Sequence, residues 1–229
     1  MNIYEIESII NYKFQKPELL GQAFVHSSFV NEQQLDALDN NERLEFLGDA
    51  VLSIIVSDYI YKEFPDLTEG ELTRLRASVV CEASLSKQAR NMNLGKFLQM
   101  GKGETSSGGA NRDSILCDLY ESVLGAIYLD GGYKQACIYV MNSLKAEIHS
   151  MKGLDWIADP KTHLQEQLQK TSSEPIEYNV IHESGPAHSK LFKVQLSQSG
   201  KLLGEGEGKN KKEAEQNAAR NAIEKYKLF

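Results

Sequence analysis

The sequence has little of what marks secreted and membrane proteins. It has three cysteines, unevenly spaced and without a CxxC pair, so a reducing cytoplasm fits best. Cys117 and Cys137 lie in apolar stretches and are expected to be small core residues. No apolar run approaches the roughly 20 residues that cross a bilayer. The first residues, MNIYEIESIINYKF, carry acids early and no basic leader, so we expect no signal peptide, a cytoplasmic location and no membrane partner.

The sequence also lacks the net positive charge typical of a nucleic-acid-binding protein, because its formal net charge is −7. The charge is unevenly divided. Residues 160–229 hold 11 Lys and Arg against 9 Glu, a balance of +2, which leaves −9 for residues 1–159. Such asymmetry predicts two domains with different tasks. A chain of 229 residues is long enough for each domain to bury a core.

The acidic part of the chain contains carboxylates among apolar residues. Residues 41–56 read NERLEFLGDAVLSIIV. On a helix, the i, i+3, i+7 spacing of Glu42, Glu45 and Asp49 places all three on one face. A helix this apolar is expected to be mostly buried. Because buried carboxylates are costly unless they are paired or bind metal, a divalent cation is the natural counter-charge.

A second apolar run repeats the pattern. Residues 113–131 contain Asp118 and Glu121, which are i and i+3 on one helix face. Two such helices can form one cluster of five carboxylates, and ligands that are all oxygen favour Mg²⁺ or Mn²⁺ over zinc. A solvated stripe on each helix is the alternative, which its occurrence twice disfavours. A di-iron bundle is disfavoured because neither run has the Glu-x-x-His spacing.

Helical periodicity runs up to about residues 148–160, and no alternating strand pattern stands out before them. The first domain is therefore expected to be all-α. The Gly/Ser-rich stretch 101–111 is expected to be a flexible loop, or else a loop that approaches a phosphate backbone with Lys102 and Arg112 beside it. The expected helices are 3–13, 17–25, 41–64, 69–91, 93–98, 113–129 and 133–151.

From residue 160 onward the pattern changes. Pro160 begins a short helix over 160–170, and alternation then places Ile176, Tyr178 and Val180 on one face of a strand. KLFKVQLSQ and KLLGEGEG read as two further strands before a final helix. The α-β-β-β-α order predicts a small α+β domain with both helices on one face of an antiparallel sheet. Small residues would let the last helix lie close to that sheet: Ala214, Ala218, Ala219 and Ala222.

Lysines cluster where the last helix is expected to begin. Lys209, Lys211 and Lys212 oppose the helix dipole there, which makes sense if a polyanion docks at that end. A solvated face is the alternative. The loop 185–188 reads GPAH and could lie at a groove edge, although His188 needs the fold to support such a role.

These motifs closely resemble bacterial ribonuclease III over essentially the whole chain. NERLEFLGD at 41–49 resembles the signature of that family, and the segment from Ser107 to Glu121 resembles its second catalytic segment. QAFVHSS at 22–28 and EGELTRLRA at 69–77 resemble further family blocks.

The resemblance implies a domain organisation. An all-α endonuclease domain is expected over residues 1–150 and a linker over 151–159. A double-stranded-RNA-binding domain of α-β-β-β-α order is expected over residues 160–229, marked by its Gly-Pro-x-His loop and the Lys-Lys-x-Ala start of its last helix.

The resemblance also implies roles for individual residues. The metal-site carboxylates would be Glu45, Asp49, Asp118 and Glu121, with Asp49 and Glu121 as catalytic residues. Glu42 would be a supporting acid, and Glu69 an acid that the family's dimer brings near the partner's site. RNA-contacting positions would be Gln165, His188, Lys211 and Lys212. Lys209 is added as an RNA-binding residue because it lies in the lysine cluster at the helix start. The sequence departs from the family at Ser27, where Arg is frequent, and at Cys117, where Ala is frequent.

The implied activity is Mg²⁺-dependent hydrolysis of double-stranded RNA, with Mn²⁺ able to replace Mg²⁺, giving 5′-phosphate and 3′-hydroxyl ends. The implied assembly is a homodimer whose two sites cut opposite strands. Ribosomal RNA precursors and other structured transcripts are the implied substrates, with little base specificity. The alternatives are a non-cleaving double-stranded-RNA-binding protein with a dimerising helical domain, which the complete acidic set disfavours, and a metal-free structural bundle.

Overall fold

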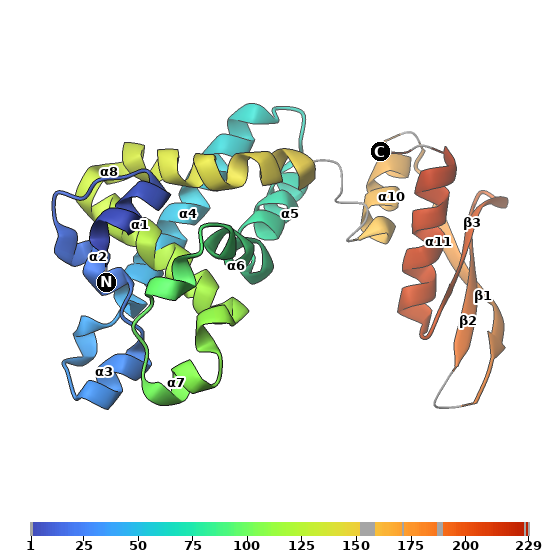
Figure 1. The fold of residues 1–229 in the computed structure, drawn as a ribbon. Helices are drawn as coiled ribbons and strands as arrows, with labels where there is room; N and C mark the ends of the chain where they lie inside the picture. Colours follow the sequence, from blue (N-terminus) through green and yellow to red (C-terminus); the bar gives the residue numbers. More distant parts are fainter. Residues whose placement is uncertain (1, 152–158, 171, 187–189, 227, 229) are drawn as a thin grey trace. The chain divides into compact units, whose positions relative to one another are not determined.

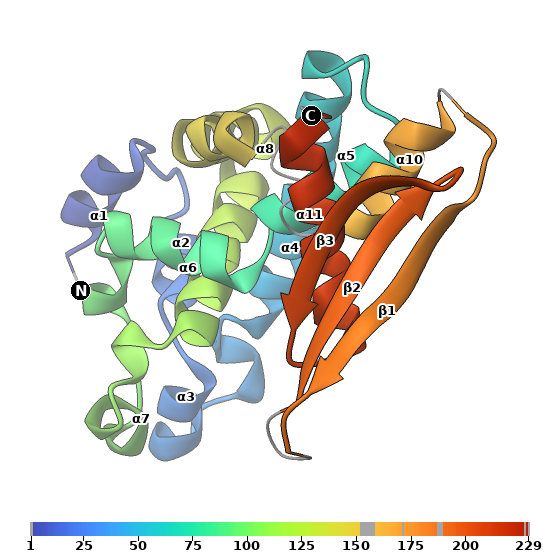
Figure 2. The ribbon, with the colours of Figure 1, turned by 90° about the vertical axis from the view of Figure 1, so that its right-hand side faces the viewer.

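The computed structural model divides the chain into two compact units, residues 1–149 and 150–229. It describes residues 2–151, 159–170, 172–186, 190–226 and 228. Within these residues the first unit is built from helices, and the second packs two helices on a three-stranded sheet (Figures 1 and 2).

Helices account for the first unit, which confirms the all-α expectation. The α-helices described there are α1 (Ile3–Ile10), α2 (Pro17–Ala23), α3 (Ser27–Gln33), α4 (Glu42–Glu63), α5 (Glu69–Val79), α6 (Glu82–Asn91), α7 (Lys102–Ser106) and α8 (Asp113–Met151). Short 3-10 helices lie between them: η1 (Ala37–Asp39), η2 (Leu94–Phe97) and η3 (Gly109–Asn111). In the described part of this unit, strand pairing is limited to an isolated bridge between Val25 and Gln99.

Local sequence signals explain several helix boundaries. Thr68 accepts a hydrogen bond from the backbone N–H of Glu71, whose carboxylate accepts one from Thr68 in return, so a capping box begins α5. Gly132 interrupts α8 with a φ of 74°, a backbone conformation that favours glycine. This break separates the two helical runs that the sequence predicts on either side of residues 130–132.

Two expected elements differ in the structure, and one helix was not expected. The helix expected over 69–91 is two helices, because Cys81 is extended (φ −77°, ψ 158°) after the β-branched Val79 and Val80. The stretch 101–111 is not an irregular loop, since it contains α7 and η3. Helix α3 was not expected at all.

Helix α4 is not buried all round, contrary to the expectation from its composition. Leu44, Leu52 and Ile55 lie in the core. Phe46, however, is 80 % exposed and Ile54 is 58 % exposed. One apolar face of α4 therefore has nothing from the described part of the chain covering it.

The second unit has the expected α-β-β-β-α order. Its described elements are α10 (Pro160–Gln169), β1 (Ile176–Ser184), β2 (Leu191–Gln198), β3 (Lys201–Gly208) and α11 (Lys211–Tyr226). The sheet is antiparallel in the order β1-β2-β3. A register shift lies in β1 between Val180 and His182, and Val180 is exposed instead of sharing a buried face with Tyr178.

Small residues bring α11 against the sheet, as the alanine stripe predicts. A β-carbon at Gly206 of β3 would lie 2.1 Å from the backbone nitrogen of Ala218, and one at Gly204 would lie 2.5 Å from its carbonyl oxygen. Helix and strand therefore touch backbone to backbone. The core of this unit is Leu164, Phe192, Val194, Leu196, Leu203, Ala214, Ala218, Ala219, Ala222 and Ile223.

Candidate metal centre and nucleic-acid interface

Glycines hold the two acidic helices in close contact. A β-carbon at Gly48 of α4 would lie 1.9 Å from the carbonyl oxygen of Glu121 in α8. One at Gly125 of α8 would lie 2.2 Å from the carbonyl oxygen of Leu44. Because both positions lack side chains, the helix backbones meet directly next to the acidic residues.

Next to this contact, the predicted carboxylates lie near enough for their charges to act between the two helices. Burial, followed by the charges of Asp118, Glu42 and Asp49, raises the pKa of Glu45 to about 7. Burial, followed by the charges of Asp49, Glu45 and Asp118, raises the pKa of Glu121 to about 8. The acids that the sequence singles out on the two runs thus all contribute to the raised pKa of Glu45 or of Glu121.

Among the described residues, no lysine or arginine pairs with the cluster. In the part of the chain that the structure describes, none of the five acids forms an ion pair with a Lys or Arg side chain. Glu42 and Asp49 are exposed, whereas Glu121 is only 9 % exposed. Negative charge at this density, partly buried and unpaired, suits a divalent cation.

Two charged groups near the cluster were missed by the sequence analysis. Burial raises the pKa of Asp118, the charge of His26 opposes that rise, and the charge of Glu82 adds to it. His26 is the N-cap of α3 and Glu82 lies in the first turn of α6. The motif QAFVHSS contains His26, but only the fold shows that its charge acts on Asp118.

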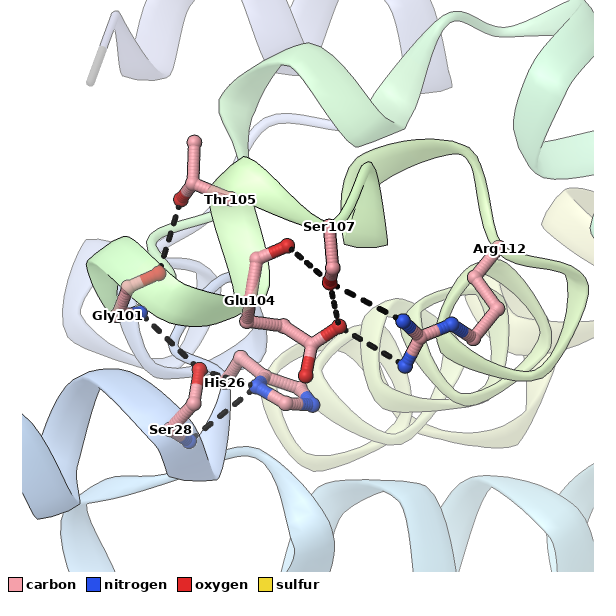
Figure 3. Close-up of polar contacts among 7 residues, drawn as sticks. All are labelled: His26, Ser28, Gly101, Glu104, Thr105, Ser107 and Arg112. Atoms are coloured by element: carbon pink, nitrogen blue, oxygen red, sulfur yellow. Dashed lines mark hydrogen bonds and ion pairs between the residues drawn. The ribbon is translucent and has the colours of Figure 1, made fainter.

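Hydrogen bonds fix the ring of His26. The backbone N–H of Ser28 donates to its Nδ1 over 3.2 Å, and the Ser28 hydroxyl lies 2.7 Å from the same atom. Gly101 N–H donates to that hydroxyl over 3.0 Å, as Figure 3 shows. Since Nδ1 is an acceptor, a neutral His26 carries its proton on Nε2.

In the segment for which approach to phosphate was the alternative prediction, Arg112 contacts side chains of the same segment. Arg112 forms an ion pair with Glu104 over 2.8 Å and donates to the Ser107 hydroxyl over 3.2 Å (Figure 3). Lys102 is exposed beside it, 4.0 Å from the carboxylate of Glu32. The guanidinium of Arg112 is therefore engaged within this segment.

Cys117 is not a core residue, contrary to expectation, since its side chain is half-buried. Its Sγ and carboxylate oxygens of Asp118 and Glu121 lie within 4.8 Å of one another, close enough to hold a metal ion together. Cys137 is also half-buried, and Cys81 is exposed.

Glu69 lies on a different helix from the five acids of α4 and α8. It begins α5, where its carboxylate accepts a hydrogen bond from the Thr73 hydroxyl over 2.9 Å. The charges that raise the pKa values of Glu45, Asp118 and Glu121 come from other residues.

In the second unit, the predicted lysines lie at one end of the sheet. The register pairs Phe192 with Gly208 and Glu183 with Phe192, so the end of β1, the start of β2 and the end of β3 lie together, next to the start of α11. The charge of Lys211 accordingly helps to lower the pKa of Glu183, after the hydrogen bond from Lys190. Lys209, Lys211, Lys212 and, on α10, Gln165 are all exposed. His188 lies outside the described residues.

The start of α11 is capped from within the chain. Asn210 accepts a hydrogen bond from the backbone N–H of Glu213, and Glu213 accepts one from the N–H of Lys209. Glu213 offsets the unfavourable dipole interaction of the lysines, whose side chains point to solvent. This end presents exposed positive charge to any polyanion.

Family comparisons match both units. Residues 16–148 match the family described as Ribonuclease-III-like, and residues 160–226 match the double-stranded RNA binding motif. Fold and site therefore define a helical nuclease domain followed by a double-stranded-RNA-binding domain.

Individual relatives agree with this class. The chain is 49 % identical to Ribonuclease 3 of Desulforamulus reducens over 219 residues, which cover 96 % of this chain and 89 % of that protein. It is 43 % identical to Ribonuclease 3 of Listeria monocytogenes over 221 residues, 96 % of each. A nuclease domain of ribonuclease III from Campylobacter jejuni matches with a TM-score of 0.59 and 39 % identity, over 63 % of this chain and 97 % of that one. The chain belongs to the ribonuclease III family and is an enzyme of the ribonuclease class.

Within the described residues, no helix is both apolar and long enough to cross a bilayer.

Proposed function

We propose that this protein is an Mg²⁺-dependent endoribonuclease that hydrolyses double-stranded RNA to 5′-phosphate and 3′-hydroxyl ends. The observation that carries the proposal is the cluster of unpaired carboxylates where α4 meets α8, with the pKa of Glu45 raised to about 7 and that of Glu121 to about 8. Mn²⁺, which takes the same oxygen ligands, can replace Mg²⁺.

Glu45, Asp49, Asp118 and Glu121 would hold the ion. When bound, Mg²⁺ supplies an activated water and stabilises the leaving 3′-oxygen. Asp49 is exposed and Glu121 is buried, so these two can face the RNA and the interior respectively. Glu42 adds negative charge to Glu45 and Asp118 without being buried itself. The residues thus concentrate cation at a site that would otherwise repel RNA.

The second unit would deliver the duplex. Lys209, Lys211 and Lys212 offer charge to phosphates, while Gln165 on α10 is exposed and able to reach 2′-hydroxyls of a minor groove. His188 stays a prediction from the family resemblance. Domain limits of 1–150 and 160–229, with 151–159 as a linker, also belong to the proposal.

A homodimer would complete the enzyme. Phe46 and Leu129 border a hollow of about 540 Å³ that Leu19, Gln22 and Leu47 also line. Phe46 is 80 % exposed and Leu129 is 48 % exposed, and such apolar surface marks an interface. In a two-fold dimer each Phe46 can enter the hollow of the other copy. The C. jejuni nuclease domain is itself described as having a region involved in dimer formation.

The dimer also gives Glu69 its proposed place, near the partner's acidic site.

Three free cysteines fit a reducing cytoplasm. Ribosomal RNA precursors and other structured transcripts are the proposed substrates, since the RNA-binding unit reads duplex shape more than base sequence.

A labelled duplex tests the proposal. Incubation with Mg²⁺ should give internal cuts whose 5′ ends carry phosphate, and a chelator should abolish them. Glu121→Gln should bind the duplex without cutting it, whereas Glu18→Gln, an exposed acid on α2, should cut normally. Cleavage that persists in chelator, or at the normal rate in Glu121→Gln, would overturn the assignment.

A further inference from the structure

We propose that Cys117, Asp118 and Glu121 form a second, soft-metal binding mode of the acidic centre, in which a thiophilic divalent cation such as Zn²⁺ or Cd²⁺ is held by one sulfur and two carboxylate oxygens and excludes the hard ion. The inhibitory consequence rests on the proposed function; the binding itself does not.

The three ligand atoms are already close together. The Sγ of Cys117 and one carboxylate oxygen each of Asp118 and Glu121 lie within 4.8 Å of one another. Around a tetrahedral zinc ion, sulfur and oxygen ligands lie about 3.3–3.6 Å apart. Cys117 and Asp118 lie four and three residues before Glu121 on one helix, and these are the two spacings at which helical side chains are neighbours.

The buried carboxylate is the second feature that points to a cation. Glu121 is only 9 % exposed, and among the described residues none donates a hydrogen bond to its side chain or pairs with it as an ion. A carboxylate that has lost its water and gained no partner is costly. A metal ion next to it would remove that cost.

The surroundings of the thiol favour a cation over an oxidative partner. Burial, followed by the charges of Glu121, Asp118, Glu82 and Glu45, raises the pKa of the Cys117 thiol, so a bound metal ion must displace its proton. Cys81 and Cys137 are free as well and lie on other turns or helices. A thiol with a raised pKa reacts poorly with oxidants and disulfides, whereas the surrounding carboxylates attract a divalent cation.

Sulfur is what separates this mode from the oxygen site. Glu45 and Asp49 together with Asp118 and Glu121 offer oxygen alone, which suits Mg²⁺. A set with one thiolate selects zinc-like ions instead. Because Asp118 and Glu121 belong to both sets, a chain that holds the soft ion cannot hold Mg²⁺ on the same oxygens.

Cadmium titration of the full chain, without Mg²⁺ or RNA, tests the binding directly. A cadmium–thiolate bond gives an ultraviolet charge-transfer band. The band should saturate at about one ion per chain, persist when Cys81→Ser and Cys137→Ser leave Cys117 as the remaining thiol, and disappear in Cys117→Ser. Added Zn²⁺ should displace Cd²⁺ and remove the band. Absence of the band in the wild-type chain, or its survival in Cys117→Ser, would refute the site.

Two carboxylate variants test the rest of the ligand set. Asp118→Asn and Glu121→Gln should each weaken cadmium binding by about tenfold or more, while Glu18→Gln should leave it unchanged. Undiminished binding in both carboxylate variants would reduce Cys117 to a simple surface thiol and overturn the proposal. Circular dichroism of each variant confirms that the fold is retained.

A cleavage assay tests whether the soft ion inhibits the enzyme. Each variant is compared with its own rate in Mg²⁺ alone, and added Zn²⁺ should inhibit the wild-type chain at about tenfold lower concentration than it inhibits Cys117→Ala. Equal inhibition of both would show that zinc does not act through the thiol. If the chain proves inactive on every duplex, the proposed function fails, but the cadmium band still decides the metal site.

Discussion

Gly48 of α4 touches the backbone of Glu121 in α8 so closely that a β-carbon on Gly48 would lie 1.9 Å from the Glu121 carbonyl oxygen. Real atoms cannot approach to this distance, so any side chain at residue 48 must push the helices apart. The contact lies one residue from Asp49 and directly at Glu121. A change in the packing of α4 against α8 at this contact should therefore also displace the acidic residues beside it.

Gly48→Ala should consequently reduce both stability and cleavage. Overpacking at a backbone contact costs about 1–3 kcal/mol in the free energy of unfolding. The shift between α4 and α8 should also lower the rate of cleavage by a factor of about 100. Urea unfolding and a cleavage assay in Mg²⁺ measure the two effects.

Gly21→Ala is the matched control. Gly21 lies inside α2, and a β-carbon there would meet nothing within 4 Å. Replacing a helical glycine in open space should stabilise the chain by about 0.5–1 kcal/mol. If the two variants behave alike, the helix contact does not determine the geometry of the site.

The metal-free protein should lose stability as the pH rises. Burial and neighbouring acids raise the pKa of Glu45 to about 7 and that of Glu121 to about 8. The folded chain therefore holds protons that the unfolded chain has already released. The stabilisation is complete below the pKa of a free glutamate, about 4.3, and is lost as the pH passes through about 7 and 8. The free energy of unfolding should fall by on the order of 1–3 kcal/mol between about pH 5 and about pH 8.

Glu121→Gln should flatten this pH dependence, because an amide does not titrate. Denaturant unfolding in chelator at several pH values measures the slope, and Glu18→Gln should preserve it. A wild-type chain equally stable across the range would mean that the carboxylates are not desolvated as the geometry indicates.

Binding of Mg²⁺ should release protons and strengthen with pH. Carboxylates must be deprotonated to coordinate the ion, and near neutral pH Glu45 and Glu121 are partly protonated. Calorimetric titrations in two buffers of different ionisation enthalpy should show about one proton released per ion near pH 7. Identical apparent enthalpies in the two buffers would contradict the raised pKa values.

The carboxylate set was within reach of sequence reasoning because Glu45, Asp49, Asp118 and Glu121 interrupt two apolar runs at helical spacing. His26 and Glu82 were not, since they approach the acids from α3 and α6. The position of His26 depends on α3, a helix that the sequence did not predict. The position of Glu82 depends on the helix break at Cys81. The exposure of Phe46 could not be predicted from the sequence either, because apolar periodicity does not distinguish a helix face covered by the same chain from one covered by another chain.

The lysines at the start of α11 should govern duplex binding through charge. Lys211→Ala combined with Lys212→Ala should weaken affinity for double-stranded RNA by about tenfold and reduce its salt dependence by about one to two ions. Lys201 and Lys225 lie at the opposite end of β3 and of α11. Replacing both by Ala gives a control with the same charge change. Equal losses in the two double variants, measured by filter binding at several salt concentrations, would show a general charge effect rather than docking at this end.

Phe46→Glu should dissociate the proposed homodimer. The ring is 80 % exposed beside the hollow that Leu19 and Leu129 line. A charge placed there would have to be buried in an apolar interface, which costs several kcal/mol. Tyr4→Glu is the matched control, because Tyr4 on α1 is also 80 % exposed. Light scattering after size-exclusion chromatography should show a monomer only for Phe46→Glu, with the helical content of the chain unchanged. A wild-type chain that is already monomeric, or a Phe46→Glu variant that stays dimeric, would place the interface elsewhere or remove it.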